Sequence, residues 1–145
     1  MTQIRTVLPP KQAAPFRYFR TCYRHPAGQV GVAISDWLFD LAWVMPVGGG
    51  YRLSNTGLVS LYALGVRSQR LATHHVYGFC ADLTEKRQHL KGDLGAALTG
   101  WLMDRAWATR TPVDEQARRS GGRELRLTEV GHLGLTSLGV KLPDS

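Results

Sequence analysis

The sequence predicts an α+β, mostly helical fold of two tandem winged-helix-like repeats, packed on each other with pseudo-twofold symmetry. Each repeat is expected to be a helix, a β-ribbon and a second helix. A block that begins at His25 recurs without a gap from His89, and a second block at Tyr51 recurs from Leu125. Because an internal repeat defines the architecture of a chain, these two matches are the basis of the prediction.

The first block predicts the long helix of each repeat. It reads HPAGQVGVAISDWLFDLAW from His25 and HLKGDLGAALTGWLMDRAW from His89. Apolar side chains recur through both copies at the intervals of one helix face. Since a glycine weakens a helix by roughly 1 kcal/mol relative to alanine, the paired residues Gly28 and Gly92 predict a helix boundary or a close packing contact.

A β-ribbon and a capped helix are expected after each long helix. Short extended segments flank a glycine-rich turn in the first repeat and a longer loop, as far as residue 122, in the second. Ser54 and Thr128 stand where an N-cap belongs, because their hydroxyls accept hydrogen bonds from the first turn. Gly65 and Gly139 stand at the matching C-terminal ends, where glycine adopts the left-handed conformation.

The repeats divide the chain into four segments that together form one compact unit. We expect a leader over residues 1–19, a first repeat over 20–66, a linker over 67–79 and a second repeat over 80–145. Neither repeat alone is long enough to bury both of its helices, so the two are expected to share one core.

The composition is that of a basic globular protein. Of 145 residues, 43% are hydrophobic and 20% charged, with a net charge of +7, which excludes an intrinsically disordered chain. No apolar run approaches the roughly 20 residues that span a bilayer, and no secretory signal is present. We therefore expect a cytoplasmic protein with no membrane partner. The charge favours DNA as a partner and a basic protein that binds no nucleic acid about equally.

Cysteine and histidine recur together at matched positions of the two repeats. Cys22 with His25, and Cys80 with His89, offer two sulfur and two nitrogen ligands, a set that zinc accepts. The pairs are three and nine residues apart, and this unequal spacing argues against a metal site. One disulfide is arithmetically possible, but free thiols are the expectation in a reducing cytoplasm. We expect no cofactor, with zinc as the alternative.

The loop of the second repeat predicts a DNA contact. A β-ribbon wing lies along the DNA backbone, where basic side chains bind phosphates. The alternative is a solvated loop without a partner. The candidate residues in and beside this loop are Arg110, Arg118, Arg119, Arg123 and Arg126.

Four tryptophans are candidates for a small-molecule pocket between the repeats. Trp37, Trp43, Trp101 and Trp107 supply large aromatic surfaces, although such side chains more often pack in a core. The sequence shows no phosphate-binding loop, nucleophile elbow or metal-hydrolase signature. We therefore expect that the protein is not an enzyme.

Three phrases of the chain resemble the C-terminal region of ArsR-type bacterial transcriptional regulators, which are winged helix-turn-helix proteins. They are CYRHPAGQVGVA from Cys22, CADLTEKRQHLKGDLGAA from Cys80 and LRLTEVG from Leu125. The resemblance implies a role in transcription regulation, through DNA-associated basic wings or as an effector and dimerisation module. It also implies a homodimer or a separate DNA-binding partner, because we expect the N-terminal DNA-reading domain of those regulators to be lacking. A metal- or small-molecule-sensing domain that binds no DNA is the alternative.

Overall fold

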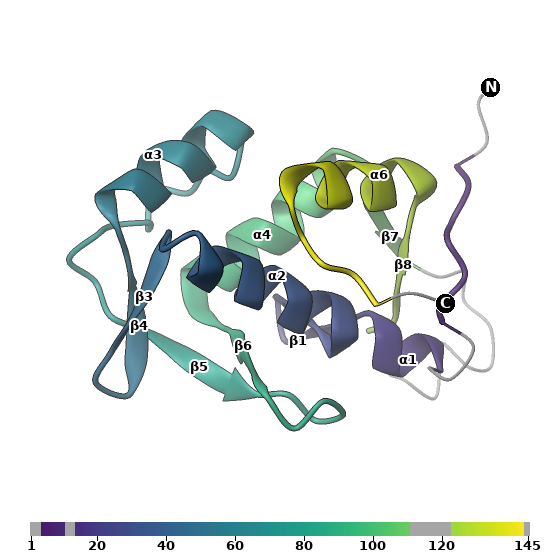
Figure 1. The fold of residues 1–145 in the computed structure, drawn as a ribbon, viewed down its shortest axis with the longest axis horizontal. Helices are drawn as coiled ribbons and strands as arrows, with labels where there is room; N and C mark the ends of the chain where they lie inside the picture. The colour runs from purple at the N-terminus through teal and green to yellow at the C-terminus, as the bar shows by residue number, and fades with distance from the viewer. Residues whose placement is uncertain (1–3, 11–13, 111–122, 144–145) are drawn as a thin grey trace.

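Two long helices, α2 and α4, lie at the centre of the molecule, and short hairpins and helices surround them (Figure 1). The computed structural model describes residues 4–10, 14–110 and 123–143. The elements are, in order, α1 (Pro15–Tyr18), β1 (Arg20–Cys22), β2 (His25–Ala27), α2 (Gly28–Asp40), β3 (Val44–Val47), β4 (Gly50–Leu53), α3 (Asn55–Leu64), β5 (Tyr77–Ala81), β6 (Gln88–Leu90), α4 (Gly92–Asp104), β7 (Ala108–Arg110), β8 (Leu125–Leu127) and α6 (Glu129–Leu138).

The prediction of a mostly helical fold is wrong. Of the described residues, 40% are helical and 25% lie in strands, so the fold is α+β with a large share of both. The strands of three or four residues that make up most of this share are too short to show a period in the sequence. They form the sheets β1-β2, β3-β4-β5-β6 and β7-β8.

The predicted packing of two equivalent repeats with pseudo-twofold symmetry is likewise not found. The sheets contain two, four and two strands, so the sheets do not divide equally between the two repeats. The cause is β5, which pairs with β4 through Gly50↔Gly78 and Tyr51↔Tyr77 and thereby joins the two halves of the chain in one sheet. β5 runs across the boundary that we expected at residues 79 and 80.

The expected starts of the long helices are confirmed. α2 begins at Gly28 and α4 at Gly92, where φ is +76° and +83°. A side chain is strained at such backbone angles, whereas glycine is not. Gly28 directly follows hairpin β1–β2, and Gly92 follows hairpin β5–β6 after one residue, Lys91, so both hairpins lead into the long helices.

The expected caps of the short helices are also confirmed. Ser54 Oγ and Thr128 Oγ1 each accept a hydrogen bond of 2.9 Å from the backbone N–H three residues further on. Gly65 and Gly139 end the helices in the left-handed conformation. The expected β-ribbons before these helices are present as β3–β4 and β7–β8. The intervening loop residues 111–122 lie outside the described residues.

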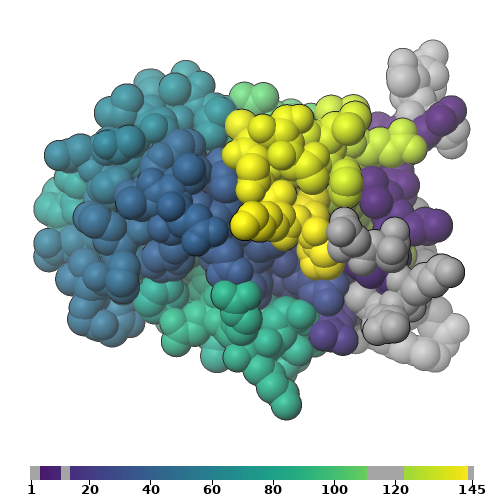
Figure 2. All heavy atoms as spheres, in the orientation of Figure 1, coloured from purple at the N-terminus to yellow at the C-terminus, as the bar shows by residue number. Residues whose placement is uncertain are grey.

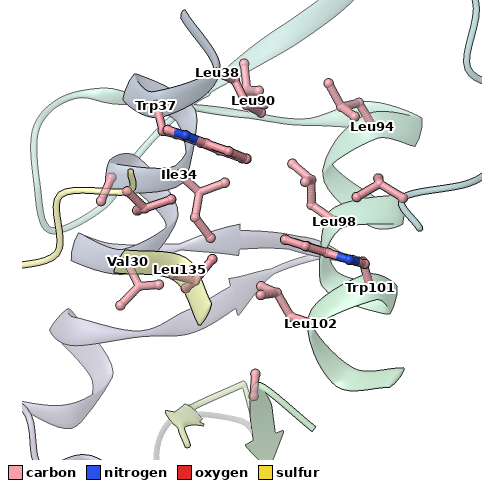
Figure 3. Packing of buried hydrophobic residues seen from close by; sticks show 14 of the residues in the cluster. Val30, Ile34, Trp37, Leu38, Leu90, Leu94, Leu98, Trp101, Leu102 and Leu135 are labelled. Carbon is pink, nitrogen blue, oxygen red and sulfur yellow. The ribbon is translucent and has the colours of Figure 1, made fainter. Parts of the chain in front are cut away.

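The core lies between α2 and α4, whose apolar faces point toward each other (Figure 3). The space-filling view shows that α6, in yellow, lies directly against α2, in blue (Figure 2). The segment expected as a leader contributes α1 and the fully buried Phe19. No helix in the described part of the chain is long and apolar enough to cross a membrane. The labelled core residues in Figure 3 are Val30, Ile34, Trp37, Leu38, Leu90, Leu94, Leu98, Trp101, Leu102 and Leu135.

Candidate metal centre

Two β-hairpins bring the four predicted metal ligands together. Cys22 lies directly opposite His25 in hairpin β1–β2, and Cys80 lies directly opposite His89 in hairpin β5–β6. Directly opposed residues of antiparallel strands point to the same face of their hairpin. The unequal spacing in the sequence therefore reflects only a longer turn in the second hairpin and is no argument against a shared site.

A glycine allows the first hairpin to approach the second. A Cβ atom added at Gly95 in α4 would lie 2.5 Å from His25 Cβ and 2.8 Å from the Leu90 carbonyl oxygen. These distances are shorter than real Cβ contacts, so a side chain at this position would push the hairpin away from α4. As a result of the close approach, the rings of His25 and His89 lie 5.0 Å apart between centroids.

The ligand atoms lie at separations that fit a single metal ion. Cys22 Sγ and one ring nitrogen each of His25 and His89 lie within 4.8 Å of one another. Cys80 is not in this set of three, but its Sγ lies 3.6 Å from Cys22 Sγ. A tetrahedral zinc ion with Zn–S bonds of about 2.3 Å holds two sulfurs about 3.8 Å apart. The sulfur pair is thus already near that spacing.

Two imidazole nitrogens in the cluster are buried and lack a partner. His25 Nδ1 and His89 Nε2 make no hydrogen bond to any residue that the structure describes. The two side chains belong to residues that are 5% and 1% exposed. A buried polar atom without a partner costs about 1–3 kcal/mol, so such atoms in a native protein require an explanation. Coordination of a metal ion would satisfy both nitrogens.

Asp82 holds the His89 ring in a fixed orientation. Asp82 Oδ2 lies 2.9 Å from His89 Nδ1 and accepts a hydrogen bond of 2.8 Å from the backbone N–H of Gly28. A carboxylate on one ring nitrogen favours the tautomer in which the other nitrogen carries the lone pair. This arrangement is common behind metal-bound histidines, and here it leaves Nε2 as the donor atom.

Hydrogen bonds keep Asp82 ionised. Burial alone would raise the pKa of this carboxyl, but hydrogen bonds from His89 and from the backbone of Gly28, Glu85 and Thr84 hold its pKa well below the usual range. Its other oxygen, Oδ1, lies 3.0 Å from a guanidinium nitrogen of Arg20, and both side chains are almost fully buried. The pair joins β1 to the loop after β5.

The sequence did not point to Arg20 or Asp82 as site residues. A local signal for Asp82 exists, because Asp side chains often accept hydrogen bonds from backbone N–H groups two or three residues further on. Asp82 Oδ1 accepts such bonds from Thr84 and Glu85. Its pairing with Arg20 spans 62 residues of sequence and has no local signature.

The imidazole of His25 is neutral under ordinary conditions. Burial, followed by the nearby charges of His89 and Lys91, lowers the pKa of His25 from 6.5 to about 4. Burial and then the neighbouring Cys80 raise the pKa of the Cys22 thiol, against a smaller lowering by Arg20. At neutral pH the ring therefore offers a free lone pair, whereas the thiol would have to release a proton to bind a metal.

The arginines predicted to contact DNA lie around the β7–β8 ribbon where the structure describes them. Arg110 ends β7 and Arg123 precedes β8, and both are exposed. Arg126 forms an ion pair of 3.0 Å with the buried Glu124. Arg123 lies over the ring of Phe16, 5.7 Å from its centroid. The other two candidates, Arg118 and Arg119, lie outside the described residues.

The four predicted pocket tryptophans pack in pairs. The ring centroids are 5.2 Å apart for Trp37 and Trp43 and 5.1 Å apart for Trp101 and Trp107. The indole N–H groups of Trp37 and Trp101 donate to helix-end carbonyls at 2.9 Å. Trp37 also lines a small pocket of about 100 Å³. The ligand pocket at these four tryptophans therefore stays a prediction.

The chain is similar to one bacterial regulator over nearly its whole length. It is 26% identical over 143 residues to YdfF of Bacillus subtilis, an uncharacterized HTH-type transcriptional regulator. The match covers 97% of this chain and 60% of that protein, so the chain spans about three fifths of its relative. No protein-family model and no solved structure matches the chain significantly. The similarity is thus to an HTH-type regulator in general and does not single out the ArsR type.

Proposed function

We propose that this chain is a metal-sensing module of a transcriptional regulator, with a zinc-type ion held by Cys22, His25, His89 and Cys80. The observation that carries the proposal is a pair of buried, unpartnered imidazole nitrogens beside two thiols. Zinc prefers four sulfur and nitrogen ligands, and this cluster offers two of each. The similarity to an HTH-type regulator supports the regulatory role.

The position of the cluster suggests how an ion would act on the fold. His25 lies three residues before α2 begins, and His89 lies three residues before α4 begins. An ion bound by both hairpins would hold the N-terminal ends of α2 and α4 in a fixed position relative to each other. Because metal that binds only the folded state stabilises it, occupancy would favour one packing of α2 against α4. A regulator can use such a difference as a signal.

A zinc titration of the metal-free protein tests this proposal. With a competing chromogenic chelator present, we expect one tight equivalent of Zn²⁺ and release of protons from the thiols. Cys22→Ser and His25→Gln are expected to weaken binding by at least tenfold. His74→Gln is the matched control, because His74 is exposed and outside the cluster. Binding that is absent, or equally strong in all four proteins, would overturn the proposal.

Contact with DNA through the β7–β8 ribbon is a second candidate. It is favoured by the net charge of +7 and by the exposed positions of Arg110 and Arg123, at the end of the ribbon that is joined through residues 111–122. Binding to duplex DNA should then fall steeply with salt and weaken in the Arg118→Ala/Arg119→Ala variant, since phosphate contacts release counterions. The absence of any binding at low salt would exclude this candidate.

A further inference from the structure

We propose that Cys22 and Cys80 are a reversible redox pair, which a low-molecular-weight disulfide such as oxidised glutathione converts to an intramolecular disulfide. Formation of the disulfide bond is argued from the sulfur geometry alone. Its effect on metal binding rests on the proposed function, because the disulfide removes both sulfur ligands of the metal site. The pair would make metal binding dependent on thiol oxidation.

The two sulfurs are close enough for a small movement to join them. Cys22 Sγ and Cys80 Sγ lie 3.6 Å apart, and disulfide formation requires them to approach by about 1.6 Å to the bond length of about 2.0 Å. The cysteines belong to separate hairpins, β1–β2 and β5–β6, which contact each other through β2 and β6. Rotation of the two side chains can therefore supply much of the approach without breaking a strand pair.

The sulfurs are also the accessible part of the cluster. Both cysteines are partly exposed free thiols, whereas His25 and His89 are buried. A dissolved oxidant therefore reaches the sulfurs from the solvent side. The chain has two cysteines, so each is the other's only thiol partner within the molecule. The first mixed disulfide formed with the oxidant has a single internal thiol to resolve it.

The chemistry balances with the named oxidant. One protein thiolate attacks the small disulfide and expels one thiolate, which leaves a mixed disulfide on the protein. The second protein thiolate then attacks the protein sulfur of that bond and expels the other small thiolate. Two protein thiols lose two electrons, and the small disulfide gains them as two thiols. The resulting disulfide sulfurs are no longer the thiolates that zinc requires.

Oxidation of the wild-type protein, followed by mass spectrometry, tests the inference in two arms. Metal-free protein treated with oxidised glutathione should lose the mass of two hydrogens and retain no glutathione. Zinc-loaded protein should release its zinc in step with that mass change and regain it after reduction with dithiothreitol. Cys22→Ser is the control, and it should stop at a mixed disulfide on Cys80 with its circular dichroism unchanged.

The arms separate failure of this inference from failure of the proposed function. Two results for the wild-type protein overturn the redox pair, whether or not zinc binds. In the first, glutathione stays attached to either cysteine. In the second, the protein stays fully reduced although the same oxidant oxidises a small thiol in a parallel sample. If the protein forms the disulfide but binds no zinc in its reduced form, the redox pair is supported and the metal site is overturned. Disulfide formation that leaves the zinc in place overturns the coupling between them.

Discussion

Replacement of Asp82 by asparagine removes the carboxylate that joins the two hairpins beneath the candidate metal centre. Asp82 accepts hydrogen bonds from His89, from the Gly28 backbone N–H and from Arg20. Asparagine has nearly the same shape, but one of its two terminal atoms can only donate. The substitution therefore leaves the Arg20 guanidinium without its counter-charge in a site where that side chain is 3% exposed.

The expected loss of stability follows from this burial. Removing one partner of a buried ion pair costs about 3–5 kcal/mol, because the remaining charge is neither paired nor solvated. Asp36→Asn is the matched control. Its carboxylate lies only 2.7 Å from Arg87, but the two side chains are 41% and 60% exposed, and exposed pairs contribute about 0–1 kcal/mol. Burial, not distance, thus predicts the difference between the variants.

Urea denaturation of both variants at pH 7 measures this difference. With a slope of about 2 kcal/mol per M, Asp82→Asn should lower the midpoint by about 2 M, and Asp36→Asn by less than about 0.5 M. Asp82→Asn should also bind zinc at least tenfold more weakly than the wild-type protein, because the orientation of His89 is lost. A midpoint for Asp82→Asn within error of that for Asp36→Asn would refute the reasoning.

Two further predictions concern the same hairpins. The pKa of His25 is about 4 in the folded protein and 6.5 ordinarily, so the unfolded state takes up a proton first as the pH falls. The free energy of unfolding of the metal-free protein should therefore decrease by about 3 kcal/mol between pH 6.5 and 4. A pH series of denaturation curves checks this, and His25→Gln should flatten the decrease; an equal slope would contradict it. Gly95→Ala should destabilise the fold and weaken zinc binding, because the added Cβ meets His25. Gly100→Ala in the same helix has open space and should raise the melting temperature slightly; equal effects of the two changes would contradict the packing argument.

Local signals predicted the helix ends well. Ser54 and Thr128 cap short helices because a hydroxyl bonds to the N–H groups of the next turn, an interaction that depends on neighbouring residues alone. Gly28 and Gly92 mark helix starts for an equally local reason, their positive φ. The share of strand was underestimated because a strand of three residues has no detectable alternation.

Residue types predicted the members of the candidate metal centre better than their spacing did. Cys22 and Cys80 were expected with their histidines, but the loop length between each pair obscured a common cross-strand register. Arg20 and Asp82 were missed because their contact joins residues far apart in the sequence, and such a contact is defined only when the hairpins pack. The unequal sheets depend on a long-range pairing of the same kind, between β4 and β5.

X-ray absorption spectroscopy of the zinc-loaded protein tests the central claim most directly, because it counts the donor atoms around the ion. The four residues Cys22, His25, Cys80 and His89 predict two sulfurs at about 2.3 Å and two imidazole nitrogens at about 2.0 Å. Cys80→Ser should reduce the sulfur count to one. A first shell of oxygen and nitrogen without sulfur in the wild-type protein would contradict the account.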